Sequence, residues 1–415
     1  MHETTCGIDF GTSNTLAAIA APEGTRICEI DPANADPRLL PTLLYFSRHD
    51  FRRIGRSAVT AYQADPFGRF VRALKSALPE VTPDEQFRMF RRAYTLVDLL
   101  TLVLRRVKEQ VDACAGAPVT QVTLGRPVRF SPDPGIDARA EGMLREAAEL
   151  AGFTGVRFLS EPEAVTRYFY AATGERSEGT VLIFDFGGGT LDLCVARTGG
   201  SGYSVLATGG RHIGGTLLDR ILFENKLLHH LGKGETWSGG LELPRSLFNR
   251  LVNPDANWRI TEQEYTSEVR RIFNASAATG GAARLATLHT VVSRRLGPDL
   301  FAAIEAAKVR LSEEERTTIS YQADGVSIEE PLSRADLRTL FREQLQEIRR
   351  LIDETLAKAG LAPREIDRVL LAGGSSALIC TQELLREIFG EERVPLRQDL
   401  YTSIVSGLAL DAAAG

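Results

Sequence analysis

The stretch Val181–Val195 reads VLIFDFGGGTLDLCV and combines an apolar run, an acidic residue, three glycines and a second apolar run. This order predicts a β-hairpin whose turn holds a phosphate group. Glycine has no Cβ, so the amide groups of Gly187, Gly188 and Gly189 are able to fold inward around an anion. Thr190 adds a hydroxyl group beside them. A tight hairpin with solvated acidic residues is the simpler alternative, because glycine-rich turns are common.

Two aspartates flank this turn, and a second copy of the pattern lies at the N-terminus. Asp185 ends the first apolar run and Asp192 lies on the returning strand. Carboxylates are poor core residues, but their oxygens suit a hydrated Mg²⁺. The stretch CGIDFGTSNTLAAIA, which begins at Cys6, repeats the Asp-Phe-Gly order with Asp9. Its turn comprises Gly11, Thr12, Ser13 and Asn14. The repetition favours a phosphate site over two unrelated turns.

Two further turns combine glycine with hydroxyl side chains at the start of a helix. They comprise Gly373, Gly374 and Ser375 within VLLAGGSSALI, and Gly214, Gly215 and Thr216 within RHIGGTLLDRIL. The N-terminus of a helix offers free amide groups to an anion. The sequence therefore predicts four turns that converge on one phosphate-bearing ligand.

Length, composition and charge limit the class of protein. A chain of 415 residues with 43% hydrophobic and 25% charged residues is too long for one ordinary core and predicts two or three domains. The net charge of −5 gives no electrostatic reason for binding nucleic acid or an anionic membrane. In addition, no apolar run reaches the length of a membrane span. We therefore expect neither nucleic acid nor a membrane as a partner.

The five cysteines are scattered, odd in number and never in a CxxC pair. This argues against a disulfide framework and against zinc, and it fits a reducing compartment. The first residues lead directly into a strand without a basic start or a cleavage site, so we expect no targeting segment and a cytoplasmic location.

Strands and helices alternate in two passes, and each pass begins with an Asp-Phe-Gly hairpin. This predicts an α/β protein of two related lobes that face one cleft. Phe67–Glu80 has apolar residues near helical spacing, and we expect Lys75 within it to be solvated. Glu161 stands at a strand-to-helix junction, where it is a mediocre helix cap, which leaves room for a chemical role.

At these motifs the sequence resembles the ATPase domain of the seventy-kilodalton heat-shock chaperone family, within the actin and sugar-kinase superfamily. IDFGTSN, SEPEA, LIFDFGGGTLD, the Gly214–Gly215 turn, IEAAKVRLS and LLAGGSS occur in the family's order over nearly the whole chain. The resemblance implies a two-lobed actin-like ATPase fold of duplicated ribonuclease-H-like domains with a nucleotide cleft between the lobes. Lobe I would span residues 1–175, with 396–415 returning to it. Lobe II would span residues 176–395 and include a peripheral helical subdomain at about 222–300.

The resemblance also implies roles for individual residues. Thr12 and Ser13 would be phosphate ligands, and the four glycine turns would bind the nucleotide. Asp9 and Asp185 would lie around the hydrated Mg²⁺, with Thr190 and Asp192 beside the γ-phosphate and a monovalent cation such as K⁺. Lys75 would reach the γ-phosphate and the attacking water, and Glu161 would match the family's acidic residue. Glu305, Lys308 and Ser312 would contact the nucleoside, although from spacing alone they form a polar helix stripe with an ordinary ion pair.

The sequence departs from the family pattern in the adenine pocket and at the end of the chain. Val309 and Ala377 stand where the family has arginines. A guanidinium over an aromatic face is worth about 0.5 to 2 kcal/mol, so the two losses together would weaken nucleotide binding by roughly one to three decades. Gly407 lies in the last family helix, and we therefore expect no peptide-binding domain.

The function that the resemblance implies is Mg²⁺-dependent ATP binding with slow hydrolysis, in a chaperone-like, nucleotide-gated module. Its partners would be ATP or ADP and an unidentified protein partner or co-chaperone. The alternatives are a small-molecule kinase of the same superfamily and a nucleotide sensor or scaffold without turnover. A protein kinase is disfavoured because the chain has no HRD motif.

Overall fold

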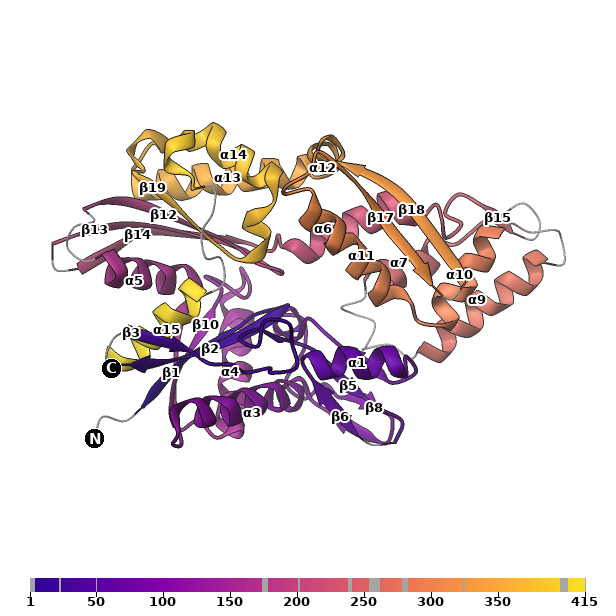
Figure 1. The fold of residues 1–415 in the computed structure, drawn as a ribbon, viewed down its shortest axis with the longest axis horizontal. Coiled ribbons are helices and arrows are strands. Elements are labelled where there is room, and N and C mark those ends of the chain that lie inside the picture. Colours follow the sequence, from indigo (N-terminus) through magenta and orange to yellow (C-terminus); the bar gives the residue numbers. More distant parts are fainter. Residues whose placement is uncertain are drawn as a thin grey trace.

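A computed structural model of the protein describes residues 4–21, 24–49, 51–173, 178–200, 202–237, 241–253, 262–277, 283–323, 325–395 and 402–414. Two main sheets lie one above the other, with helices on their outer sides and a peripheral group of helices and hairpins at one end (Figure 1). Among the described residues, no helix combines the length and the apolar character needed to cross a membrane.

The first sheet has the strand order β11-β10-β1-β2-β3, and a short strand β4 also pairs with β2. Its strands are β1 (Thr5–Phe10), β2 (Asn14–Ala21), β3 (Gly24–Ile27), β4 (Leu40–Pro41), β10 (Gln121–Arg126) and β11 (Gly155–Ser160). Strands β1, β2 and β3 form an antiparallel meander, and β10 runs parallel to β1.

The second sheet has the order β14-β13-β12-β19 and repeats this plan. Its strands are β12 (Gly179–Phe186), β13 (Leu191–Gly199), β14 (Gly202–Arg211) and β19 (Arg368–Ala372). Strands β12, β13 and β14 again form an antiparallel meander, with β19 parallel to the first strand. The predicted α/β fold class with duplicated domains is confirmed. The exact lobe boundaries, at residues 175 and 396, lie outside the described residues and stay a proposal.

Helices cover the outer face of each sheet (Figure 1). The long helices α3 (Leu96–Ala115) and α4 (Pro134–Ala151) pack on each other below the first sheet, and α13 (Arg342–Ala359) packs on the second, followed by α14 (Ile379–Phe389). Helix α3 begins with a capping box, in which Thr95 Oγ1 accepts the Asp98 amide at 3.1 Å and Asp98 Oδ2 accepts the Thr95 amide at 2.8 Å. Apolar residues recur at helical spacing in this part of the sequence, among them Leu96, Leu100, Val103 and Leu104, which predicts the helix, and they are buried in it.

A smaller region follows the first meander. It contains β5 (Leu44–Phe46), β6 (Arg52–Ile54), α1 (Arg56–Ala64), β7 (Arg69–Val71), α2 (Leu74–Ala77), β8 (Phe87–Met89) and β9 (Arg92–Tyr94). The predicted helical spacing over Phe67–Glu80 is wrong for its first half, because Phe70 pairs with Tyr45 in a strand. A short apolar run fits a strand as well as a helix, so spacing alone did not separate the two.

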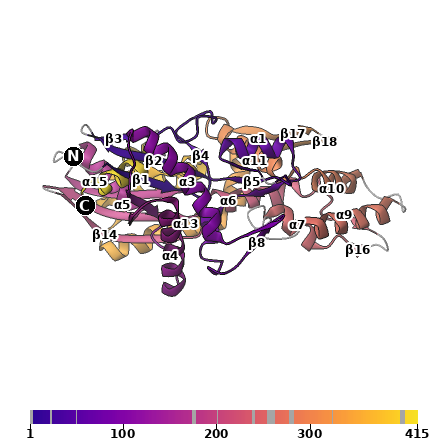
Figure 2. The ribbon, with the colours of Figure 1, turned by 90° about the horizontal axis from the view of Figure 1, so that it is seen from below.

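The peripheral group extends away from the two sheets, as Figure 2 shows from below. It contains α6 (Gly215–Leu222), the π-helical turn η2 (Phe223–Leu227), β15 (Thr236–Trp237), β16 (Leu241–Glu242), α7 (Arg245–Val252), α9 (Glu262–Ala277), α10 (Ala283–Ser293), α11 (Gly297–Arg310), β17 (Arg316–Ala323), β18 (Val326–Ser333) and α12 (Arg334–Leu340). In the sequence, Ser333 followed three residues later by Asp336 resembles a capping box, with aspartate in place of the usual Glu or Gln. The structure confirms it: Ser333 Oγ accepts the Asp336 amide at 3.1 Å, and Asp336 Oδ2 accepts the Ser333 amide at 2.9 Å. The range of about 222–300 that the sequence predicts for a peripheral subdomain stays a proposal.

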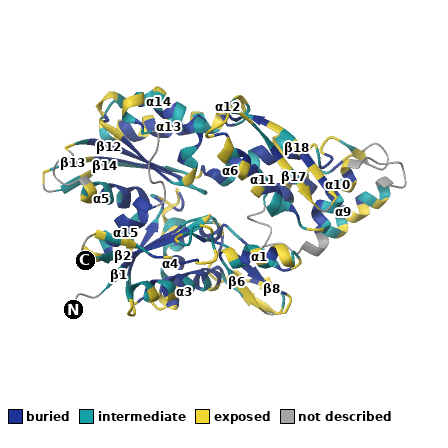
Figure 3. Ribbon diagram, in the orientation of Figure 1, coloured by how far each residue is buried: buried dark blue, intermediate teal, exposed yellow. Residues whose placement is uncertain are grey.

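Helices α5 (Glu161–Thr173) and α15 (Thr402–Ala414) lie between the two sheets (Figure 1), and their buried side chains mix with those of β12, β13 and β19 in one core cluster (Figure 3). Two glycines let the backbones approach. A Cβ at Gly407 would lie 1.8 Å from the carbonyl oxygen of Ala164 in α5, and a Cβ at Gly7 in β1 would lie 2.3 Å from the Ala409 amide nitrogen. This contact fixes α15 against the first sheet.

Replacing Gly407 by alanine is therefore expected to lower the free energy of unfolding by at least about 2 kcal/mol, because the added methyl group overlaps a backbone atom. A matched control is Gly142→Ala in α4, where nothing lies within 4 Å of the added Cβ. That control should be neutral or raise stability by up to about 1 kcal/mol. Urea unfolding followed by circular dichroism measures both, and equal midpoints would contradict the close α5–α15 contact.

Candidate functional site

The two hairpins bring their acidic residues to equivalent places. Asp9 is the second-to-last residue of β1, and Asp185 is the second-to-last residue of β12. Asp185 stands directly opposite Asp192 in the antiparallel pair of β12 and β13. Directly opposite residues share one face of a sheet, so these two carboxylates lie on the same side. Glu161 joins them from the first turn of α5, as its place at the predicted junction indicated.

All four acidic side chains are buried, with exposed fractions between 1% and 9%. Burial, followed by the charge of Glu161, raises the pKa of Asp9 to about 7, and the same two causes raise the pKa of Asp192 to about 7. Burial also raises the pKa of Asp185 well above its usual value. Because these pKa values are raised in the folded protein, the free energy of unfolding falls as the pH rises through about 7 and the buried carboxyl groups become charged. A cation bound beside them would offset this loss at neutral pH.

Lys75 supplies part of that positive charge. It lies in α2, is buried, and its Nζ pairs with Glu161 Oε1. The prediction of a solvated lysine is wrong, because α2 is turned toward the acidic residues rather than toward water. Burial acts to lower the pKa of Lys75, but the attraction of Glu161 and then of Asp9 outweighs it and holds this pKa above its usual value. Lys75 therefore keeps its charge at neutral pH.

One lysine does not satisfy every carboxylate oxygen. Asp185 Oδ2 and Asp192 Oδ2 are buried without a hydrogen-bond partner among the described residues. Asp192 Oδ1, in contrast, accepts the Val128 amide at 2.8 Å. Within the described part of the chain, these acidic groups do not form a set of three with all ligand atoms within 4.8 Å of one another. Their oxygens are of the kind that suits a hydrated Mg²⁺, and they would hold such an ion through its water molecules.

The turns of the two hairpins face each other at contact distance. A Cβ at Gly188 would lie 2.6 Å from Ser13 Oγ, and a Cβ at Gly189 would lie 2.8 Å from Thr12 Oγ1. The hydroxyl oxygen of Ser76, the residue after Lys75, would lie 3.1 Å from the same Cβ at Gly189. A side chain at either glycine would displace these hydroxyl groups. The first-lobe hydroxyls and the second-lobe glycines thus form one polar lining.

The other two glycine turns brace the second hairpin. The amides of Gly215 and Thr216, at the start of α6, donate to the carbonyl oxygens of Gly187 and Gly188 at 3.0 and 2.9 Å. Ser375 Oγ donates to the Gly187 carbonyl oxygen at 2.9 Å. These donors are already used, so in this structure the two turns fix the hairpin. Gly214, Gly373 and Gly374 lie in the same two turns, and the predicted phosphate contacts of all these residues stay predictions.

The family model described as Hsp70 protein matches residues 75–236 and 289–411 of this chain. The chain belongs to the Hsp70 family. The matched segments include Lys75, Glu161 and the Gly187–Gly189 turn. They omit residues 237–288, which contain α7, α9 and part of α10.

Curated proteins that are similar to this chain carry the name chaperone protein DnaK. The chaperone protein DnaK of Thermotoga neapolitana is 24% identical over 398 residues, which cover 94% of this chain and 56% of the relative. That of Thermosipho melanesiensis is 24% identical over 418 residues, covering 99% and 59%. That of Elusimicrobium minutum is 27% identical over 417 residues, covering 98% and 57%. The chain thus spans somewhat more than half the length of these relatives.

The helix that the Hsp70 resemblance assigns to the nucleoside is α11. Its Lys308 Nζ pairs with Asp219 of α6, which ties α11 to the helix that braces the hairpin. Ser312 Oγ donates to the Val309 carbonyl oxygen at 2.5 Å, and Glu305 is exposed. The partner of Lys308 therefore lies on α6 and not within the polar stripe of its own helix, from which spacing suggested an ordinary ion pair. The nucleoside roles of these residues stay predictions.

Both departures from the Hsp70 pattern are accessible. The Val309 residue is 65% exposed, and Ala377, at the end of the short helix η5 (Gly374–Ala377), is half-buried. A hollow of about 470 Å³ also lies on α11, lined by Ala303, Ala306 and Arg310 among others. At 100° per residue this face is opposite Lys308, so the hollow is separate from the predicted nucleoside contacts.

Hydrogen bonds between segments far apart in the sequence were not predicted from the sequence. Arg295, between α10 and α11, donates through Nη1 to the carbonyl oxygens of Pro66 and Gly68 at 3.0 and 2.9 Å. Tyr62 Oη of α1 donates to the Arg295 carbonyl oxygen. These residues join the peripheral group to the region of β5–β7. No local sequence pattern signals them, since the partners are more than two hundred positions apart.

Proposed function

We propose that the protein binds Mg²⁺-ATP between the two hairpins and hydrolyses it slowly, as a nucleotide-gated module of the chaperone type. The observation that carries this proposal is the buried group of Lys75, Glu161, Asp9 and Asp185 next to two facing phosphate-type turns. Membership of the Hsp70 family supports it. A role for K⁺, a co-chaperone or other protein partner, and a cytoplasmic location belong to the same proposal.

The acidic residues would hold Mg²⁺ through its water ligands, and the ion would supply positive charge to the triphosphate. The unpaired Oδ2 atoms of Asp185 and Asp192 support this assignment. The Thr190 side chain acts to lower the pKa of Asp192, so it lies beside that carboxyl group, and it would present its hydroxyl beside the γ-phosphate. Gly187–Gly189, Thr12 and Ser13 would surround the phosphates with amide and hydroxyl donors.

Lys75 and Glu161 carry the chemical step. The Lys75 ammonium group stabilises the negative charge that develops on the γ-phosphoryl oxygens as the bond to the β-phosphate breaks. Glu161 accepts a hydrogen bond from the attacking water and orients it in line with that bond. The buried ion pair between the two side chains holds both in place before the ligand arrives, so little reorganisation is needed.

Nucleotide gating follows from the contact between the hairpins. Thr12 and Ser13 lie so close to Gly188 and Gly189 that the two turns would have to separate to admit a triphosphate. The contacts of Arg295 with Pro66 and Gly68 join the peripheral group to the region of β5–β7, and a movement that separates these two parts would break them. Bound nucleotide would thus change how the two lobes meet, which is the basis of a switch.

The metal assignment is tested by Asp185→Asn. Removing this carboxylate is expected to weaken Mg²⁺-dependent ATP binding by about 10- to 100-fold, because it removes charge from around the water ligands of the ion. Isothermal titration with ATP, with and without Mg²⁺, measures the difference. Asp353→Asn, an exposed carboxylate on α13, is the matched control and should bind like the unaltered protein. An unchanged Mg²⁺-ATP affinity in Asp185→Asn would contradict the assignment.

A nucleotide sensor without turnover is the second candidate, favoured by the valine and alanine at positions 309 and 377. Single-turnover measurement with radiolabelled ATP distinguishes them: a sensor binds ATP and releases it unchanged. A small-molecule kinase, in contrast, would need an acceptor, so release of phosphate without any added metabolite counts against it.

A further inference from the structure

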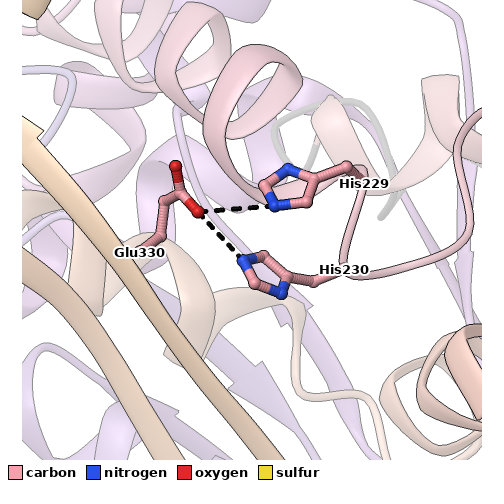
Figure 4. Close-up of side chains that lie close together, drawn as sticks. All are labelled: His229, His230 and Glu330. Carbon is pink, nitrogen blue, oxygen red and sulfur yellow. Dashed lines mark hydrogen bonds and ion pairs between the residues drawn. The ribbon is translucent and has the colours of Figure 1, made fainter.

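Two adjacent histidines in the peripheral group converge on one carboxylate. His229 and His230 follow the π-helical turn η2, and Glu330 lies on β18, about a hundred positions further along the chain. His230 Nε2 lies 3.1 Å and His229 Nε2 3.4 Å from the same atom, Glu330 Oε2. Figure 4 shows both imidazole rings directed toward that oxygen. The nucleotide site uses none of the three residues.

The spacing of the three atoms matches a metal site. All three potential ligand atoms lie within 4.8 Å of one another. With metal–ligand bonds of about 2.0 to 2.2 Å, two ligands of a tetrahedral ion lie roughly 3.3 to 3.5 Å apart. The two histidine–glutamate separations of 3.1 and 3.4 Å are close to this value, and the two imidazole nitrogens lie within 4.8 Å of each other, so side-chain shifts bring all three atoms around an ion.

The positions of the two carboxylate oxygens of Glu330 favour this interpretation. Lys226 Nζ lies 3.7 Å from Oε1 and is itself held by the Pro331 carbonyl oxygen and Asp336 Oδ1, both at 3.2 Å. This arrangement orients one oxygen toward the lysine and leaves the other toward the histidines. A ligating carboxylate is commonly oriented by such an outer contact.

The site is partly open to solvent. The side chains of His229, His230 and Glu330 are 45%, 26% and 16% exposed, so an ion has a path in and water is available to complete its coordination. Imidazole nitrogen with a single carboxylate suits zinc, cobalt, nickel and copper ions better than Mg²⁺ or Ca²⁺, which prefer oxygen-only sites.

We propose that His229, His230 and Glu330 bind a divalent transition-metal ion of the zinc class, with water in the remaining coordination positions. The ion would join the end of the α6–η2 segment to β18. Since α6 begins at the amides that brace the Gly187–Gly189 turn, the site lies at the opposite end of the same helical segment. The proposal is independent of ATP hydrolysis.

The test is a titration of the full chain with Zn²⁺ in competition with a chromophoric chelator. Excess Mg²⁺ is present to occupy the acidic residues of the nucleotide site. We expect one equivalent of Zn²⁺ to bind with a Kd of about 1 µM or below. The double variant His229→Gln with His230→Gln should weaken binding at least 100-fold, and Glu330→Gln at least tenfold. His212→Gln, an exposed histidine elsewhere, is the matched control and should bind like the unaltered protein.

Two readouts besides affinity identify the ligands. Co²⁺ should give the visible absorption of a four-coordinate ion with the unaltered chain and lose it with the double histidine variant. Zn²⁺ should raise the Tm relative to a chelator-treated sample, and this shift should vanish in Glu330→Gln. If the double variant does not fold, Glu330→Gln alone decides. Equal Zn²⁺ affinity and equal Tm shifts in the unaltered protein and Glu330→Gln, or no stoichiometric binding, would overturn the proposal.

Discussion

Replacing Lys75 by methionine is expected to lower the single-turnover rate of ATP hydrolysis by about 100-fold or more, while ATP affinity changes far less. The ammonium group acts mainly on the charge that develops during phosphoryl transfer, and removing one such donor typically costs two to three decades of rate. Methionine keeps most of the side-chain volume, so the packing of α2 is largely preserved. Rapid-quench measurement of labelled phosphate gives the rate directly.

The buried ion pair complicates this experiment, because Lys75→Met leaves the Glu161 carboxylate among other buried acids without its partner. An uncompensated buried charge lowers stability. The double variant Lys75→Met with Glu161→Gln removes both charges and separates a folding effect from a catalytic one: it should regain the Tm but not the rate. Lys358→Met, an exposed lysine on α13, is the control. A hydrolysis rate within about threefold of the unaltered protein would remove Lys75 from the mechanism.

The hairpins were predictable from the sequence because their signals are local. An apolar run, an aspartate and three glycines specify both a turn and the strand ends around it, and Asp185 and Asp192 follow from the two-residue period of the strands. The repetition of that pattern at Asp9 also predicted the duplicated sheet plan. Helix α3 was predictable for the same reason, since a regular apolar stripe defines it, whereas its capping box was recognised only in the structure.

The surroundings of Lys75 were not predictable in this way. Its flanking residues fit either a strand or a helix, and whether a lysine is solvated depends on what the rest of the chain places around it. Burial here results from Glu161 and Asp9, which lie on other elements. The same holds for Lys308, whose polar stripe was recognised but whose partner, Asp219, belongs to α6.

Long-range contacts set the remaining limit. Arg295 has no neighbour in sequence that explains its hydrogen bonds to Pro66 and Gly68. The convergence of His229 and His230 on Glu330 likewise depends on how η2 lies against β18. Two adjacent histidines in a chain with six were a signal, but neither a spacing rule nor a family motif connected them with a glutamate on a distant strand.

Restoring both arginines of the adenine pocket, Val309→Arg with Ala377→Arg, is expected to tighten ADP binding by about 10- to 100-fold. Each guanidinium stacked on the adenine ring contributes about 0.5 to 2 kcal/mol. The position of Val309 supports the experiment, because at 65% exposure the longer side chain fits without displacing core atoms. The gain should appear chiefly as slower ADP dissociation, since affinity changes within one site mostly alter the off-rate.

Stopped-flow displacement of a fluorescent ADP analogue measures the dissociation rate, and calorimetry measures the affinity. Added positive charge alone attracts a nucleotide, so the control must carry the same charge elsewhere: Ala302→Arg with Ala357→Arg places two arginines at exposed helical positions. Raising the salt concentration should remove any gain in that control and leave most of the gain in the pocket variant, because stacking is short-ranged. If the folded pocket variant binds ADP no better than the control, the base lies elsewhere, and the nucleoside roles of Glu305, Lys308 and Ser312 fall with it.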